Sequence, residues 1–286
     1  MKRFWLYISL LVFGVFAVSS CSEDVDFDPT IYDTDTPELS AIDSFIRQNY
    51  IDPHNIEVLY KWKDIETEAD KNLVPPRQDT VVPFLRVVKK AWIDTYIDLT
   101  SPEVMNPIFP KQILLLGSAS YNIDGTQTLG TAEGGKKVVL YSVGDFNPGD
   151  KANIKQYIRV LHHEFCHILN QKKEYNIAYE QITPSGYTAS WTNFRDNTAR
   201  AAGFITPYAM AAPGEDFAEM VAEYVTDTDE EWNALMETIT DGAGKAAIQK
   251  KLEIVRTYMD ESWNMKLDDL RSLILKAITE ITEGNY

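Results

Sequence analysis

Cysteine is nearly absent from this chain of 286 residues, which contains only Cys21 and Cys166. A fold held together by a framework of disulfides needs several cysteine pairs, so that class of small secreted domain is excluded. The chain must instead bury enough apolar surface to fold without crosslinks. Its length is sufficient for one large domain, or for two lobes around a cleft.

Basic residues are also scarce. Lys and Arg number 27 against 43 Asp and Glu, which gives a formal net charge of −16. A protein with this excess of negative charge repels the phosphate backbones of DNA and RNA. We therefore expect no nucleic-acid partner.

A hydrophobic run long enough to cross a membrane is missing as well. The largely apolar residues 4–18 follow a short basic start and are too few for a span. Because residues 19–21 are Ser-Ser-Cys, the pattern predicts a lipoprotein signal peptide over residues 1–20, cleaved before Cys21. Two acyl chains on Cys21 would give a stable membrane anchor. The alternative is an ordinary secretory signal followed by an unmodified cysteine.

Residues 21–38 form an acidic segment with seven carboxylates and no basic residue. Its like charges and few large apolar side chains predict an extended tether ahead of a folded domain at residues 39–286. Acidic residues directly after the cysteine resemble the signal that exports certain lipoproteins to the outer face of the outer membrane. We therefore expect an outer-membrane lipoprotein exposed at the cell surface. The alternative is anchoring at the periplasmic face, with the acidic segment as a plain spacer.

Histidine is rare, yet three of the four histidines lie between residues 162 and 167. Within this run, His163-Glu164-x-x-His167 is an H-E-x-x-H motif. Residues four apart share one face of a helix, so the two imidazoles can bind one metal ion. Glu164 is placed to act as a general base on a water molecule that the metal activates. The motif predicts a zinc-dependent hydrolase.

The spacing of apolar residues predicts a helix over residues 153–170. They recur at i, i+3, i+4 and i+7 and define one core-facing stripe: Ile154, Tyr157, Ile158, Leu161, Phe165, Ile168 and Leu169. At about 100° per residue, His163 and His167 point away from this stripe, toward a cleft. A purely structural helix with surface histidines is the alternative.

A second register is open, because His162 and Cys166 are also four residues apart and are also zinc-ligand types. Cys166 is more simply explained as a small packing residue. His162 is then a hydrogen-bonded neighbour of the site or a surface residue.

A catalytic zinc ion usually takes three protein ligands. The one histidine outside the motif run is the distant His54, so an acidic residue is the better candidate. The apolar spacing of residues 215–225 predicts an amphipathic helix with Glu215, Glu219 and Glu223 on one face. Like charges at this spacing cost about 0.2–0.5 kcal/mol per pair, and a nearby cation would relieve the repulsion. A solvated acidic face is the alternative.

The combination of His163-Glu164-x-x-His167 with Glu215-x-x-x-Glu219 resembles the gluzincin metallopeptidases, in which a glutamate on a second helix completes the zinc site. It is most similar to the lethal-factor-like branch and to bacterial lipoproteins described as putative zinc-binding metallopeptidases. Among these it resembles the substrate import-associated zinc metallohydrolase lipoproteins, which accompany TonB-dependent import systems of the outer membrane.

The resemblance implies a role for each site residue. His163, His167 and Glu215 would bind Zn²⁺, and Glu219 would orient a ligand imidazole. Tyr208 lies seven residues before the ligand glutamate and would stabilise the oxyanion formed during hydrolysis. An ordinary loop aromatic is the alternative for this tyrosine.

The resemblance also implies a zincin-like α+β fold in which a small sheet packs on the H-E-x-x-H helix. We expect a lobe with the sheet and the site helix at residues 39–171, and a mostly helical lobe at 172–286. Residues 137–143 are our candidate for the edge strand that lines the substrate cleft. Further strands are expected at 56–62 and 112–119, and further helices at 38–50, 81–95, 232–239, 245–259 and 267–281.

The segment between the two site helices is long, and such segments tend to be functional or partly structured. Its aromatic residues Tyr187, Trp191 and Phe194 either line substrate pockets or pack in the core.

The sequence thus predicts a lipid-anchored zinc metallohydrolase, in the first place a peptidase, acting on a peptide, protein or glycopeptide beside a TonB-dependent transporter. The rival hypothesis is a non-catalytic surface binding component of such an import complex with a structural or vestigial zinc site. Glu164 favours an enzyme, because it is not a ligand and a structural site does not require it.

Overall fold

The computed structural model describes residues 38–63, 66, 71–123 and 125–285. The predicted signal peptide, Cys21 and nearly all of the predicted tether lie outside the described residues. Within the described part of the chain, no helix is both long and apolar enough to cross a membrane. The residues from Leu39 onward form one unit, so the sheet and the C-terminal helices share a common core.

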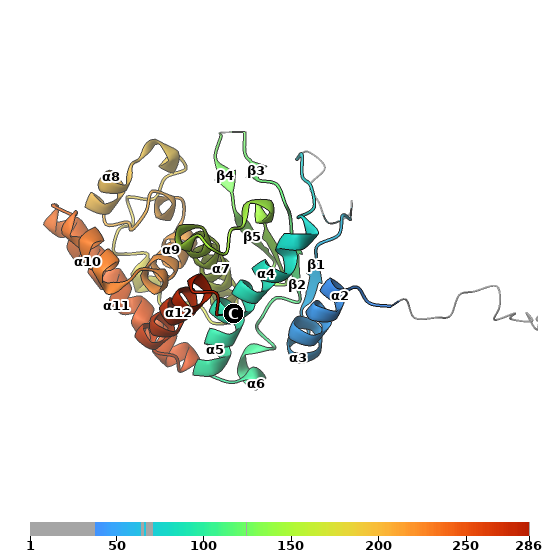
Figure 1. The fold of residues 1–286 in the computed structure, drawn as a ribbon. Coiled ribbons are helices and arrows are strands. Elements are labelled where there is room, and N and C mark those ends of the chain that lie inside the picture. Colours follow the sequence, from blue (N-terminus) through green and yellow to red (C-terminus); the bar gives the residue numbers. More distant parts are fainter. Residues whose placement is uncertain (1–37, 64–65, 67–70, 124, 286) are drawn as a thin grey trace, which may run out of the picture. The chain divides into compact units, whose positions relative to one another are not determined.

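A four-stranded sheet lies at the centre of this unit (Figure 1). Its strands are β1 (Glu57–Leu59), β2 (Gln112–Leu115), β6 (Lys137–Leu140) and β5 (Gly130–Glu133), in that spatial order. Strands β1, β2 and β6 run parallel, whereas β5 runs antiparallel to β6. A separate two-stranded hairpin consists of β3 (Ser120–Tyr121) and β4 (Gln127–Thr128).

The edge strand differs from the one predicted. Residues 137–143 were expected to form it, but β6 pairs with β2 on one side and with β5 on the other. The edge is β5, whose Gly130 and Ala132 are poor strand formers. The place of β5 in the sheet depends on its pairing with β6, which its own sequence does not indicate. The β-branched run of β6 correctly predicted a strand, but not its position inside the sheet.

Both faces of the sheet are covered, as is typical of parallel strands. Ile113, Leu115, Val138 and Leu140 face the main core. The alternate residues Leu114, Leu116, Val139 and Tyr141 face the other side, where Leu73 packs on them. This alternation fixes the register of the strands, because a slip of one residue would exchange the two faces.

Helices make up most of the remaining chain, so the predicted α+β class is confirmed. Each helix expected from periodicity is present, most with bounds shifted by a few residues. The helices and helical turns before the sheet's last strand are α2 (Ala41–Ile46), η2 (Arg47–Ile51), α3 (Asp52–His54), α4 (Gln78–Val88), η4 (Lys89–Ile93), α5 (Asp94–Leu99) and α6 (Pro102–Met105). Those after it include α7 (Lys151–Lys172), α8 (Asp196–Ala201), α9 (Pro213–Thr226), α10 (Asp229–Glu237), α11 (Gly242–Trp263) and α12 (Leu267–Thr282).

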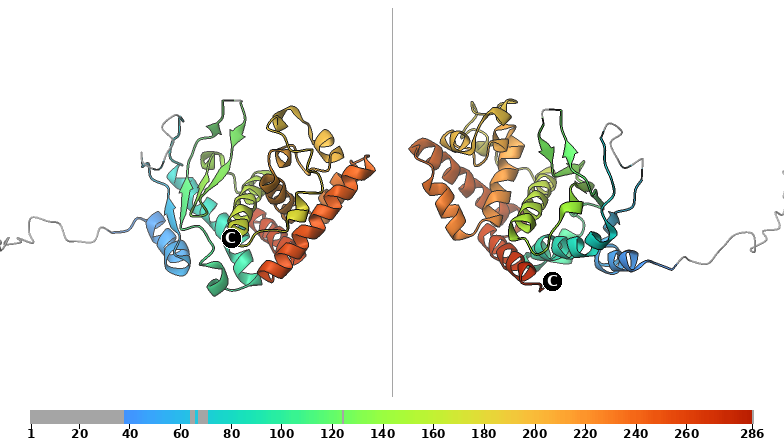
Figure 2. Two further views of the ribbon diagram at one scale, coloured as in Figure 1. Left: turned by 180° about the vertical axis from the view of Figure 1, so that it is seen from behind. Right: turned by 45° about the horizontal axis from the view of Figure 1, so that its top comes forward.

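Helix α7 carries the H-E-x-x-H motif and lies between the sheet and α9. It begins after Asp150, whose carboxylate accepts hydrogen bonds from the N–H groups of Ala152 and Asn153. Its apolar stripe is buried in the main core, as predicted. Figures 1 and 2 show α11 and α12 on the opposite side of the molecule from β1, which leaves α7 and α9 at the centre.

Candidate metal centre

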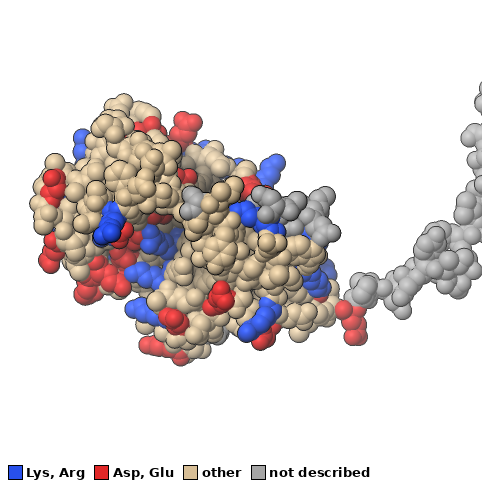
Figure 3. All heavy atoms as spheres, turned by 90° about the horizontal axis from the view of Figure 1, so that it is seen from above, with Lys and Arg blue, Asp and Glu red and all other residues tan. Residues whose placement is uncertain are grey.

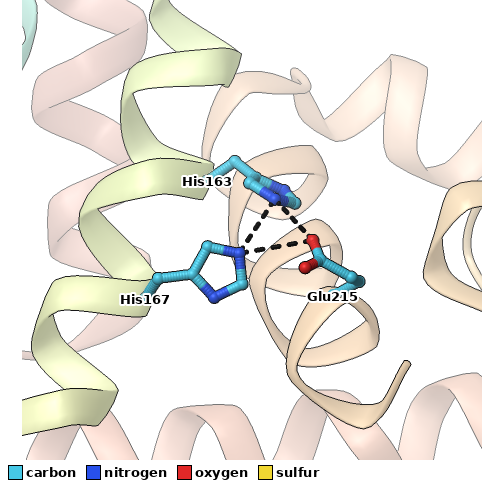
Figure 4. Close-up of side chains that lie close together, drawn as sticks. All are labelled: His163, His167 and Glu215. Atoms are coloured by element: carbon cyan, nitrogen blue, oxygen red, sulfur yellow. Dashed lines mark hydrogen bonds and ion pairs between the residues drawn. The ribbon is translucent and has the colours of Figure 1, made fainter. Parts of the chain in front are cut away.

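Three metal-ligand atoms converge where α7 meets the first turn of α9 (Figure 4). Nε2 of His163 lies 3.0 Å from Oε2 of Glu215 and 3.1 Å from Nε2 of His167, and the His167–Glu215 separation is 3.3 Å. Tetrahedral ligands at 2.0–2.1 Å from a zinc ion lie about 3.3 Å apart. Two imidazole nitrogens and one carboxylate oxygen at these separations therefore fit Zn²⁺.

The number of protein ligands distinguishes a catalytic zinc site from a structural one. Among the described residues, only His163, His167 and Glu215 form a group of His, Cys, Asp or Glu ligands close enough to share an ion. Structural zinc sites are closed by four protein ligands, whereas catalytic sites take three and leave one position to water or substrate. His54 is remote from the group and is hydrogen-bonded to Asn106.

Glu219 lies one helical turn beyond Glu215 and contacts the other nitrogen of His163. Its Oε1 is 2.8 Å from Nδ1, an ionic contact rather than an aligned hydrogen bond. Its Oε2 accepts a hydrogen bond of 2.7 Å from the hydroxyl of Thr206. Glu219 thereby orients the imidazole so that Nε2 faces the other two donors.

The ionisable groups of the site shift one another's pKa values. Burial acts to lower the pKa of His163, but the neighbouring carboxylates of Glu215 and Glu219 outweigh it and raise this pKa to about 10. Burial acts to raise the pKa of Glu219, yet His163 and Arg159 lower it to about 2. The pKa of Glu215 is lowered well below its usual value, because its hydrogen bonds with the two histidines outweigh burial. The two carboxylates are therefore ionised at neutral pH.

The acidic face of α9 is paired with basic residues of α7. The sequence analysis did not predict these ion pairs. Arg159 forms ion pairs with both Glu219 and Glu223, and Lys155 lies 2.7 Å from Asp227. The repulsion between the stacked carboxylates is therefore relieved by Arg159 at Glu219 and Glu223, and by the histidines at Glu215. The sequence does contain a pattern that is consistent with these pairs. Lys155, Arg159 and His163 follow one another at i, i+4 spacing and so share one face of α7.

Glu164 lies beside the three donors and next to strand β5. Burial raises its pKa, although His163 and His167 oppose the shift. The backbone N–H of Ala132 in β5 lies close to this carboxylate and also acts to lower its pKa. This close approach requires a small residue in β5, since a Cβ at Gly130 would lie 2.5 Å from Cγ1 of Val160.

Tyr208 lies against the site from η8 (Tyr208–Met210). Its ring stacks on the ring of His163 with centroids 5.8 Å apart, and Trp191 packs edge-on against the same tyrosine ring with centroids 5.0 Å apart. Burial raises the pKa of the Tyr208 phenol, and the neighbouring carboxylate of Glu215 raises this pKa further. The hydroxyl is therefore protonated at neutral pH and able to donate.

The second register is not assembled. Both ring nitrogens of His162 are engaged in the core, with the hydroxyl of Tyr96 at 3.1 Å and the carbonyl of Ala91 at 3.2 Å. Cys166 is buried, and Asn170 donates a weak hydrogen bond to its sulfur. Burial lowers the pKa of His162 to about 3, so it is a neutral structural residue and not an exposed one.

A cleft runs past the group on both sides. One cavity of about 890 Å³ and one of about 680 Å³ both reach His163, Glu164 and Tyr208. Trp191 lines the larger cavity, whereas Tyr187 and Phe194 pack against the core. Figure 3 shows Lys and Arg side chains gathered along a hollow on this face.

Comparison with known proteins decides the family. A family model described as "Putative zinc-binding metallo-peptidase" matches residues 35–268. The chain belongs to this family. A crystal structure of a putative zinc-binding metallo-peptidase from Bacteroides caccae is 37% identical to it, with a TM-score of 0.73, and the match covers 88% of this chain and 97% of that chain. No curated protein matched. The zinc-binding family agrees with the predicted cofactor, Zn²⁺, and with the predicted fold.

Proposed function

We propose that this protein is a zinc-dependent peptidase in which His163, His167 and Glu215 hold the metal. The observation that carries the proposal is the convergence of these three donors beside Glu164. A three-donor set favours a catalytic site over the structural zinc of the rival binding-protein hypothesis. Bound zinc would lower the pKa of a water molecule and polarise the carbonyl of the bond to be cleaved.

Glu164 accepts the proton of the attacking water and later delivers it to the leaving amine. Its carboxylate lines the cleft next to both histidines, which is the position that such a proton transfer requires. Burial raises its pKa and so makes it a better proton acceptor than an exposed glutamate.

Tyr208 donates its hydroxyl proton in a hydrogen bond to the carbonyl oxygen as that oxygen becomes negative. Stacking on His163 holds the ring beside the site, and the raised pKa keeps the donor proton on the phenol. A donor of this kind typically contributes about 10²–10³ in kcat.

Strand β5 supports a peptide as the substrate. It is the last strand of the sheet, and its residues Gly130, Thr131 and Ala132 line the cleft beside Glu164. An extended peptide can add to such an edge through backbone hydrogen bonds.

Substitution of the proposed base tests the function. We expect Glu164→Gln to bind zinc as well as the wild type while kcat falls by about 10²–10⁴-fold, because only the proton acceptor is lost. Glu230→Gln, an exposed glutamate on α10, is the matched control and should retain full activity. Full activity of Glu164→Gln would exclude the mechanism.

We further propose that the protein is lipidated on Cys21, anchored in the outer membrane, and associated with a TonB-dependent transporter. The short apolar run before Ser-Ser-Cys and the acidic residues after it support this location. Membrane fractionation of cells that express the full chain tests it. Cys21→Ala should move the protein from the membrane fraction, and an unchanged distribution would contradict the anchor.

A further inference from the structure

The cleft continues well beyond the proposed zinc ligands in both directions along α7. The larger cavity is lined by α7 residues from Lys151 to Glu164, and the smaller one by α7 residues from His163 to Gln171. Strand β5 runs beside the part of α7 that lines the smaller cavity. Gly130 lies against Val160, Ala132 against Glu164, and Gly135, just after the strand, against Gln171.

The length of the cleft can be compared with that of a peptide. At a rise of 1.5 Å per residue, α7 extends about 18 Å from His163 back to Lys151 and about 12 Å forward to Gln171. An extended strand advances about 3.3 Å per residue. The cleft therefore accommodates about five peptide residues on one side of the site and about four on the other.

Among the residues that the structure describes, the charged side chains lining the cleft leave no unengaged group near the site that could capture a chain terminus. An enzyme that removes terminal residues needs an unengaged charge within about two residues, or 7 Å, of the bond that it cleaves. Arg159 is paired with Glu219 and Glu223. Lys155 is paired with Asp227 and Glu231.

The carboxylates nearest the site are engaged as well, since Glu215 and Glu219 both contact His163. Of the other charged residues that the structure describes in the two cavities, apart from Glu164, Lys151 and Glu174 lie at the far ends. Lys151 is about 18 Å from His163 along the axis of α7. Glu174 follows the C-terminal end of α7, and that end is about 14 Å from His163 along the axis.

We propose that the enzyme is an endopeptidase that cleaves internal bonds of extended polypeptides and binds about nine residues across the whole cleft. This inference rests on the proposed peptidase function. Among the described residues, the larger half of the cleft is lined by equal numbers of cations and carboxylates, three of each, and by the uncharged Trp191, Asn122, Gln127 and Gln156. We therefore expect it to bind uncharged side chains of the substrate.

Decapeptides with blocked and free ends test the inference directly. A quenched-fluorescence decapeptide library, acetylated and amidated, is incubated with the zinc-loaded protein. We expect cleavage at internal bonds, with kcat/KM within about threefold of the same peptides with free ends. Shortening a cleaved peptide to four residues should lower kcat/KM by about tenfold or more, because remote contacts are lost.

A variant at the far end of the cleft provides a second readout. Ala152 is exposed and lines the larger cavity. Ala152→Trp should lower kcat/KM about tenfold more for the decapeptide than for the tetrapeptide. Ala246→Trp, an exposed alanine on α11 outside the cleft, is the matched control.

Different results would contradict the endopeptidase inference and the peptidase function on which it rests. Cleavage that requires a free terminus, or that releases single residues in succession, would overturn the endopeptidase inference and leave the peptidase intact. Absence of any peptide cleavage with zinc bound would overturn the peptidase function, and this inference with it.

Discussion

At the scale of single residues, three glutamates on one face of α9 have different neighbours. Glu215 faces both histidines, Glu219 contacts His163 and Arg159, and Glu223 is paired with Arg159 alone. Burial raises the pKa of Glu223 to about 7, although Arg159 opposes the shift. These differences predict different consequences for zinc binding.

We expect Glu215→Ala to lose zinc, because only two donors remain. Glu219→Ala should weaken zinc binding by about 10–100-fold, since His163 loses the carboxylate that orients it. Glu223→Ala should leave zinc affinity unchanged and is the matched control on the same face. Zinc affinities measured by competition with a chromogenic chelator test the series. Full zinc affinity in Glu215→Ala would move the third ligand elsewhere.

Zinc binding should release a proton from His163. Its pKa is raised to about 10 in the metal-free protein, mainly by Glu215 and Glu219 acting against burial, so it carries a proton at pH 7. The metal binds only neutral imidazole, so affinity should rise about tenfold per pH unit between pH 6 and 8. Calorimetry in buffers of different ionisation enthalpy measures the released proton, and zinc binding without proton release would contradict the prediction.

The same raised pKa affects the stability of the metal-free fold. The protonated form of His163 is stabilised relative to the unfolded chain, where its pKa is about 6.5. This contribution is fully present below pH 6.5 and is lost as the pH rises toward 10.

The metal ligands could be predicted from the sequence, whereas the contacts that support them could not. His163, Glu164 and His167 follow from a spaced motif on an amphipathic helix, and Glu215 follows from the resemblance to gluzincins. The pairing of Arg159 with Glu219 and the close approach of Ala132 to Glu164 depend on tertiary contacts. The spacing of residues within one helix or strand does not predict such contacts between elements.

At the scale of elements, the close packing of β5 on α7 depends on Gly130. A Cβ there would lie 2.5 Å from Cγ1 of Val160. We expect Gly130→Ala to destabilise the protein by about 1–3 kcal/mol and to lower kcat/KM, because β5 moves away from Glu164. Urea denaturation and peptide cleavage measure the two effects.

Two further variants control this experiment. Gly242→Ala adds the same methyl group where nothing lies within 4 Å, and it should leave both quantities unchanged. Val160→Ala should restore stability when combined with Gly130→Ala. A fully active and stable Gly130→Ala protein would show that the contact is unimportant.

The first turn of α9 is fixed by a buried ion pair next to Glu215. Nζ of Lys251 lies 2.6 Å from Oδ2 of Asp216, both side chains are fully buried, and the hydroxyl of Tyr187 donates to the same carboxylate oxygen. We expect Lys251→Met to cost about 3–5 kcal/mol, because an unpaired carboxylate would remain buried. The exposed neighbour Lys250 provides the control, Lys250→Met.

Urea denaturation of the two lysine variants tests this prediction. The double variant Asp216→Asn/Lys251→Met should be more stable than Lys251→Met alone, because it removes both charges. Equal midpoints for Lys251→Met and the wild type would contradict the role of the pair.

At the scale of the whole molecule, most helices could be predicted from periodicity, whereas the fold class was implied by the resemblance to gluzincins. Long amphipathic segments such as α7, α11 and α12 have strong 3.6-residue patterns. The order of the strands could not be predicted, because β5 has no strand-like pattern of its own and joins the sheet through β6. The course of the cleft depends on that order, so it also required the structure.

The central claim is that this acidic protein, built around α7, β5 and α9, is a zinc-dependent peptidase. The most direct measurement is the metal content of the purified protein, together with cleavage of a peptide library with and without a chelator. We predict one zinc ion per chain and cleavage that the chelator abolishes and added zinc restores. Cleavage that is unaffected by complete removal of the metal, or a protein that binds no zinc, would contradict the account.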